Sequence, residues 1–155
     1  MALSSSAKGA SGVSYNFKFV QETDAPEVVI QFCTNSPLIG EFCDAPADMV
    51  VTTADAGAGV TTIRSATGST IKLTKTAGST EDITITDITN PSGAGTVYAR
   101  ILTYANTTNA DVYNVTDSAS ALGTAVDQGS VAFAITDSVS VSGAVLETLT
   151  FCVLS

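Results

Sequence analysis

The chain offers few side chains that could perform chemistry. It contains no His, which removes the usual general base and the Ser-His and Cys-His nucleophile pairs. A glycosidase needs only two carboxylates, and Glu81/Asp82 and Asp44/Asp48 are the nearest candidate pairs. Acidic residues close together in a turn are more often solvated than catalytic, so we expect no catalytic residues, no cofactor and no enzyme activity.

Three aspartates surround one loop region and could in principle hold a calcium ion. They are Asp44, Asp48 and Asp55, and Ca²⁺ accepts carboxylate and backbone carbonyl oxygens. The sequence has neither an EF-hand nor a Gly-Asp repeat. We therefore interpret these residues as solvated loop acids and expect no metal site.

Two of the three cysteines flank a turn. Residues 34–42, between Cys33 and Cys43, include Asn, Ser, Pro and Gly, which favour chain reversal. We predict a Cys33–Cys43 disulfide, which would stabilise the fold by roughly 3 kcal/mol by restricting the unfolded chain. Cys152 is then a buried thiol or an intermolecular link, and a Cys33–Cys152 bond is the alternative pairing.

Lysine could also form a covalent cross-link, because some surface β-domains contain Lys–Asn isopeptide bonds. Such a bond needs a Lys, an Asn and a carboxylate buried together. Lys18 is the candidate that lies within a strong strand pattern, but it falls on the polar face. We interpret Lys18 as an ordinary surface lysine.

The strongest structural signals are three β-strand patterns. Apolar residues alternate with polar ones from Val13 to Phe19, which predicts a strand with one aromatic face. Glu27–Cys33 is rich in β-branched and aromatic residues and predicts a buried strand. Thr96–Tyr104 has β-forming residues on both faces, so we place it centrally in a sheet.

Shorter strand patterns separated by turn signals fill most of the remaining chain. The expected strands are Asp48–Thr53, Val60–Arg64, Thr70–Lys75, Glu81–Ile88, Asp111–Val115, Ser130–Thr136, Val139–Ser142 and Ala144–Leu154. Turn signals every eight to twelve residues indicate an all-β protein, an antiparallel β-sandwich with jelly-roll-like character. Residues 13–155 suit one domain, preceded by a flexible or lightly paired leader, residues 1–12.

Charge and composition restrict the partners and the compartment. The net charge of −9 excludes the basic surface that binds nucleic acid and disfavours anionic lipid surfaces. No apolar run is long enough for a transmembrane helix, and the N-terminal residues do not resemble a signal peptide. Strands rich in Thr, Ser and Gly, together with the cysteines, favour an extracellular protein whose leader has been removed and which does not insert into a membrane.

The terminal segments suggest how copies of the chain could interact. Terminal strands lie at sheet edges more readily than central ones, and an open edge recruits another strand. We therefore consider a homopolymer joined through these strands, with other cell-surface components as possible partners. A monomer whose termini pair internally fits the pattern equally well.

Four stretches resemble secreted surface proteins of Saccharibacteria-type candidate-phylum bacteria. They are FCTNSP (Phe32–Pro37), CDAPADM (Cys43–Met49), ITNPSGAGTVYARILTY (Ile88–Tyr104) and LTFCV (Leu149–Val153). More distantly, the chain resembles the TasA and camelysin fibre-forming family and the archaeal bundling pilins, in which a terminal strand is donated to the next subunit. The resemblance implies a secreted structural protein whose leader, Ala2–Gly12, is inserted into a neighbour. The candidate subunit-interface residues are Ala2, Leu3, Ser4, Ser5, Ser6 and Ala7.

Two functions from different classes follow. The main hypothesis is a structural protein of the cell surface that assembles into an extracellular filament by strand donation. The alternative is a monomeric adhesin or glycan-binding module that uses Tyr98, Tyr104 or Tyr113 as stacking platforms.

Overall fold

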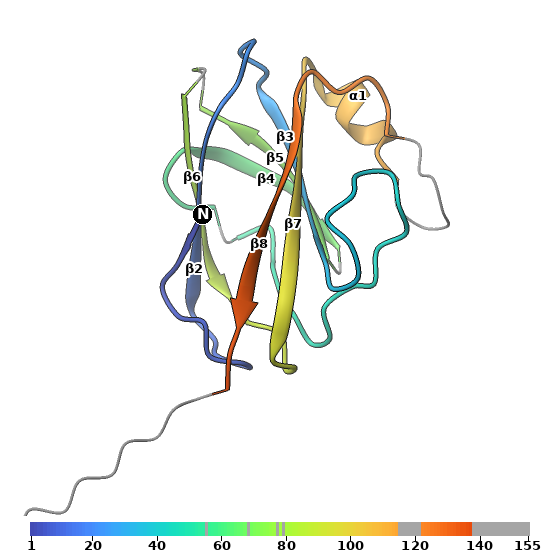
Figure 1. The fold of residues 1–155 in the computed structure, drawn as a ribbon. Helices are drawn as coiled ribbons and strands as arrows, with labels where there is room; N and C mark the ends of the chain where they lie inside the picture. Colours follow the sequence, from blue (N-terminus) through green and yellow to red (C-terminus); the bar gives the residue numbers. More distant parts are fainter. Residues whose placement is uncertain (55, 68, 77, 79, 115–121, 138–155) are drawn as a thin grey trace, which may run out of the picture.

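The computed structural model describes residues 1–54, 56–67, 69–76, 78, 80–114 and 122–137. They form a sandwich of two antiparallel sheets, so the predicted fold class is confirmed (Figure 1). The smaller sheet contains, in spatial order, β1 (Ala2–Leu3), β2 (Val13–Val20) and β6 (Thr80–Ile88). The larger contains β4 (Val60–Thr67), β5 (Thr70–Lys75), β3 (Glu27–Cys33), β7 (Gly95–Tyr104) and β8 (Gln128–Ile135), and one short helix, α1 (Thr107–Val112), follows β7.

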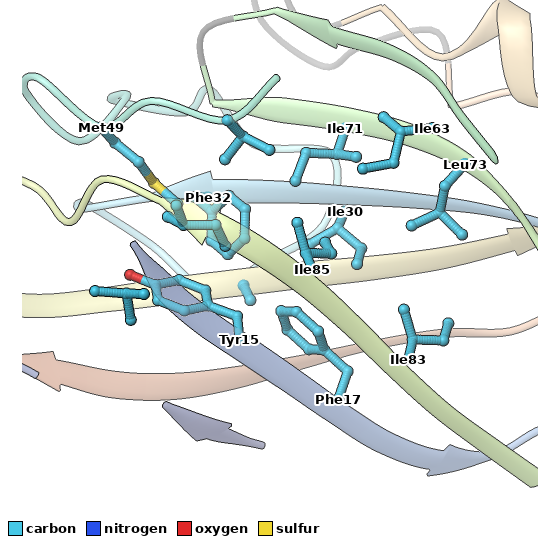
Figure 2. Close-up of a cluster of buried hydrophobic side chains, with 14 of the residues drawn as sticks. Tyr15, Phe17, Ile30, Phe32, Met49, Ile63, Ile71, Leu73, Ile83 and Ile85 are labelled. Atoms are coloured by element: carbon cyan, nitrogen blue, oxygen red, sulfur yellow. The ribbon is translucent and has the colours of Figure 1, made fainter. Parts of the chain in front are cut away.

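The main core lies between the two sheets. As the alternating pattern of β2 predicts, Tyr15 and Phe17 point inward and are buried (Figure 2). Phe32 of β3 meets the Tyr15 ring edge-on at a centroid distance of 5.8 Å, and Phe133 of β8 meets Tyr15 in the same way at 5.4 Å. Aromatic pairs prefer this geometry over a face-to-face stack, so these rings help fix how the sheets face each other.

β3 is the central strand of the larger sheet, and all its residues are buried. Val28, Ile30 and Phe32 face the core between the sheets. On the opposite face, Val29 belongs to a second apolar cluster that includes Ala110 of α1. A strand buried on both faces needs a cover on each, and the outer cover here consists of α1 and the loop after β3.

The loop after β3 is held by a buried arginine. Arg100 of β7 is 1% exposed. Its Nη2 donates to the carbonyl oxygen of Ser36 at 2.8 Å, and its Nη1 donates to that of Glu41 at 2.7 Å. The planar guanidinium thereby satisfies backbone carbonyls that the loop would otherwise leave unpaired beneath its own surface.

The predicted disulfide is confirmed. Cys33, the last residue of β3, is bonded to Cys43, with a Cα–Cα distance of 5.1 Å. The backbone N–H of Thr34 also donates to the carbonyl oxygen of Asp44 at 2.8 Å. The disulfide therefore fixes this loop at its two ends, and the Arg100 hydrogen bonds fix it in between.

Two predicted strands are wrong. Asp48–Thr53 forms a single bridge, between Val50 and Thr89, and Asp48 has a positive φ of 57° that interrupts an extended backbone. Asp111–Val115 was expected to be a strand, but its first two residues end α1, because the Asn106 side chain accepts a hydrogen bond from the Asn109 N–H and caps the helix.

Some predictions concern residues outside the described ranges. These include the strands Val139–Ser142 and Ala144–Leu154 and the state of Cys152. Among the residues that the structure does describe, no helix is long and apolar enough to cross a membrane.

Replacing Arg100 with Met should lower the free energy of unfolding by about 3 kcal/mol, because the carbonyls of Ser36 and Glu41 lose their donors in a buried site. Chemical denaturation followed by circular dichroism measures the change. Arg100→Lys is the matched variant. It keeps the positive charge but loses the planar set of donors of the guanidinium, so it should recover only part of the stability lost in the Met variant. A Met variant as stable as the native chain would contradict the role given to Arg100.

Candidate functional site: an open strand edge

The sandwich protects two of its sheet edges. At β6, the Gly57 N–H donates to the carbonyl of Thr84 at 3.0 Å and the Thr84 N–H to that of Ala58 at 2.7 Å, so a loop covers this edge. The register of β4 against β5 shifts twice, and such bulges discourage a further strand from pairing. Both devices discourage pairing between sheets of different molecules.

β8, at the opposite edge of the larger sheet, has none of these protections along most of its length. Its sequence, QGSVAFAI, contains no charged residue and no proline. It pairs with β7 without any register shift, from Gly95–Ile135 to Leu102–Gln128. A long, regular and uncharged edge strand of this kind recruits other strands.

The alternation of an antiparallel ladder shows which backbone groups of β8 face outward. Beyond the end of the strand, the Thr136 N–H donates to the Ser6 carbonyl at 2.8 Å, and the Thr136 carbonyl accepts from the Lys8 N–H at 2.8 Å, both on the side away from β7. Alternate residues of the strand share that direction: Gln128, Ser130, Ala132 and Ala134. Within the described residues these four have no backbone partner on that side.

β2 has a matching open stretch at the edge of the smaller sheet. The short strand β1 pairs with Tyr15 and Asn16 only. By the same alternation, the backbone groups of Lys18 and Val20 face the side of β1, and no strand of the described chain reaches them. The side chain of Val20, at this open stretch, is 75% exposed.

A groove of about 300 Å³ lies between these two open stretches. Its volume is at the lower end of the roughly 300–1,000 Å³ typical of ligand pockets. The apolar residues that line it are Met1, Phe17, Phe19, Val20, Ile101 and Val131. The groove therefore combines an apolar surface with unpaired strand backbone on both sides.

The N-terminal segment closes the other end of this side of the sandwich. Besides the Thr136 contacts, it is fixed by Asn90, which is fully buried and whose Nδ2 donates to the carbonyls of Ser5 at 3.1 Å and Ala7 at 2.8 Å. The Tyr15 hydroxyl donates to Asn90 Oδ1 at 2.7 Å. The candidate interface residues Ala2–Ala7 thus lie along sheet edges of their own chain, and their donation to a neighbour stays a prediction.

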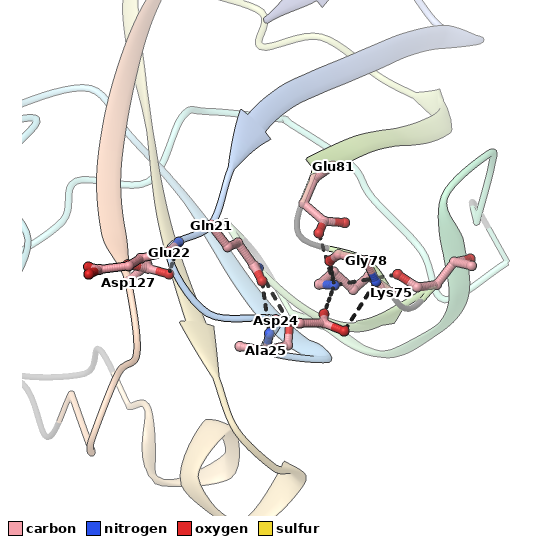
Figure 3. A network of polar contacts seen from close by, with 9 residues as sticks. Gln21, Glu22, Asp24, Ala25, Lys75, Gly78, Glu81 and Asp127 are labelled. Atoms are coloured by element: carbon pink, nitrogen blue, oxygen red, sulfur yellow. Dashed lines mark hydrogen bonds and ion pairs between the residues drawn. The ribbon is translucent and has the colours of Figure 1, made fainter.

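Polar contacts fix the chain at the groove end near Asp127 (Figure 3). The Glu22 N–H donates to Asp127 Oδ2 at 3.2 Å, which links the connection after β2 to the start of β8. Within that connection, Gln21 Oε1 accepts from the Ala25 N–H at 2.8 Å. These bonds keep the β2 and β8 edges in place relative to each other.

A buried lysine anchors the same connection. The side chain of Lys75 is fully buried, and its Nζ lies 2.7 Å from Asp24 Oδ1 and 2.9 Å from Glu81 Oε1. Nζ also donates to the carbonyl of Gly78 at 2.6 Å. Hydrogen bonds from Lys75 and from the Gly78 N–H lower the pKa of Asp24. The Asp24–Lys75 pair therefore stabilises the fold at pH values above the ordinary pKa of Asp, and this stabilisation is lost as the pH falls through the lowered pKa.

The candidate carboxylate pairs do not form a two-carboxylate site. Glu81 is buried against Lys75, whereas Asp82 is exposed and pairs with Lys18 at 2.8 Å. Lys18 is therefore a surface lysine, as expected. Asp44 and Asp48 are exposed, Asp55 lies outside the described residues, and within those residues no group of three His, Cys, Asp or Glu is placed to hold a metal ion.

Two of the three tyrosines proposed as stacking platforms are unavailable to a ligand, so the alternative hypothesis is wrong for Tyr104 and Tyr113. Tyr104 is fully buried and Tyr113 is 3% exposed. The Tyr113 hydroxyl donates to Gln31 Oε1 at 2.8 Å, and burial raises its pKa to about 12. Tyr98 is half-buried. The rings of Tyr104 and Tyr113 belong to the apolar cluster beneath α1 instead of an exposed sugar-binding face.

Sequence reasoning missed Asn90, Lys75 and Arg100. Lys75 and Arg100 lie within expected strands and Asn90 lies between two of them, but none of the three was given a role from the sequence. The signal that could have singled out Lys75 and Arg100 is their placement in strands dense with β-formers, in a chain with only six basic residues.

No protein-family model, curated protein or solved structure matches the chain. The resemblance to secreted surface proteins and fibre-forming families therefore stays a prediction.

Asn90→Ala should free the N-terminal segment, because the carbonyls of Ser5 and Ala7 lose their donor. Hydrogen exchange measured by mass spectrometry should show faster exchange in residues 4–8 while the strands stay protected, and the free energy of unfolding should fall by about 2 kcal/mol. Ser92→Ala, at an exposed position in the next turn, is the control. Unchanged exchange in residues 4–8 would contradict the anchoring role of Asn90.

Lys75→Met should reduce the free energy of unfolding by about 3–5 kcal/mol, because it leaves the Glu81 carboxylate buried without its cation. Lys18→Met is the matched control: it breaks an exposed pair between β2 and β6 and should change stability little. Urea denaturation of both variants makes the comparison. Equal losses of unfolding free energy in the two variants would show that the buried Lys75 pair contributes no more to stability than the exposed Lys18 pair.

Proposed function

We propose that this protein is a secreted structural protein of the cell surface whose copies assemble into an extracellular filament by sharing β-strands. The observation that carries the proposal is the unprotected outer edge of β8, next to an apolar groove and the open end of β2. Soluble proteins usually cover, charge or bulge such an edge, as this chain does at β6 and β4.

Secretion is supported by the covalent chemistry. A disulfide between Cys33 and Cys43 persists in oxidising compartments and is rare in the reducing cytosol. The strongly negative net charge keeps separate filaments apart in solution and argues against nucleic acid as a partner.

The N-terminal segment could join subunits by exchange. Residues 2–8 already pair with β2 and with Thr136 in their own chain, and the same contacts could form with the segment of a neighbouring copy. The exchange would use hydrogen bonds that the monomer already has, so it adds little strain. It would occupy only the far end of the β8 edge.

Electron microscopy and sedimentation of the concentrated full chain test the proposal. Filaments should form and persist in reductant, because the Cys33–Cys43 bond lies within one subunit. Ala132→Pro removes an outward N–H of β8 without breaking a bond to β7, so it should reduce the sedimenting fraction about tenfold or more.

Ala132→Ser keeps the N–H and is the matched control. If the proline variant fails to fold by circular dichroism, Ala132→Lys replaces it, since an edge lysine discourages pairing while keeping the backbone donor. A folded full chain that stays monomeric at every concentration would overturn the proposal.

A further inference from the structure

The groove between β2 and β8 still lacks an occupant in the described chain. The N-terminal segment reaches Thr136 at one end and pairs with Tyr15 and Asn16, but leaves the stretch beside Phe19, Val20 and Val131 uncovered. An inserted strand could bond to the outward groups of β8 and place alternate side chains in the groove. The occupant should therefore be an extended segment with one apolar face.

We propose that residues 144–154 of a second copy occupy this groove; the inference rests on the proposed assembly by strand sharing. In this segment Leu149, Phe151 and Val153 alternate with Thr148, Thr150 and Cys152. A strand with this alternation has one apolar face for the groove and one face of Thr and Cys for solvent. Of the other segments outside the described residues, 115–121 contains one large apolar residue, Val115, and 138–143 contains two, Val139 and Val141, and no aromatic residue.

Contacts at the end of β8 favour a second copy over the chain's own segment. To return along β8 within one chain, residues 138–143 must carry the segment past Thr136 to the outer side of the strand. At that point the outer edge of Thr136 is already bonded to Ser6 and Lys8, and Lys8 Nζ forms an ion pair with Asp137 Oδ1 at 2.6 Å. A strand from a neighbour meets no such obstacle, because it can enter from the open end near Gln128.

The native Cys152 provides a probe for this placement. If Leu149, Phe151 and Val153 face the groove, Cys152 lies on the solvent face of the extended sheet. Ser130, Ala132 and Ala134 lie on that same face of β8, and all three are exposed. A cysteine at one of these positions should therefore stand beside Cys152 and form a disulfide in air, whereas Cys33 and Cys43 are already bonded to each other.

The experiment uses the full chain carrying Ser130→Cys, Ala132→Cys or Ala134→Cys in turn, oxidised and run on a denaturing gel without reductant. At least one variant should give a ladder of covalent multimers that disappears when Cys152→Ser is added. Thr62→Cys, exposed on the opposite edge strand β4, is the control and should give no ladder. A second pair of variants tests the pattern: Leu149→Lys with Phe151→Lys should weaken the ladder about tenfold, and Thr148→Lys with Thr150→Lys should leave it.

Each remaining result overturns part of the idea. A cross-link that leaves the chain monomeric would mean that the segment pairs with its own β8. Filaments without any cross-link to Cys152 would remove residues 144–154 as the donor while leaving the proposed function intact. Absence of filaments in the folded full chain would overturn the proposed function and the donor together.

Discussion

The structure depends on the burial of β3 on both faces. A strand in that position can form only if the sandwich core covers one face and another layer covers the other. The second layer consists of α1 and the loop that the Cys33–Cys43 bond and Arg100 hold in place. The middle strands of the larger sheet are paired on both sides, so the strand backbone that lacks a partner within the described chain lies at the sheet margins, including β8 and the end of β2.

Local patterns predicted most of the strands. Alternation in β2, the dense β-formers of β3 and β7, and the hairpin of β4 and β5 can each be read within about ten residues, and the disulfide follows from a turn of similar length. The helix α1 was missed because its formation depends on one capping side chain, Asn106, and on Ala110 fitting beneath it. In the sequence, both features give a weaker signal for a helix than the surrounding β-branched residues give for a strand.

The candidate site was harder to predict from the sequence than the fold was. Placement of terminal segments at sheet edges was expected, and β1 does lie at an edge. The groove depends on how the two sheets lie relative to each other. The roles of Asn90 and Lys75 depend on contacts with Ser5 and Asp24, which are more than fifty positions away in the sequence. The misplaced tyrosines have a related cause, because Tyr suits both a buried cluster and an exposed surface, and only packing distinguishes them.

The uninterrupted register of β8 against β7 also has a mechanical meaning. A pull along β8 loads all its hydrogen bonds to β7 in shear, so they share the force and do not open one after another from an end. β7 is bonded in turn to β3, whose last residue is covalently tied at Cys33. Tension applied to this edge is therefore carried by the centre of the larger sheet, while the smaller sheet with β2 and β6 lies outside the path of the load.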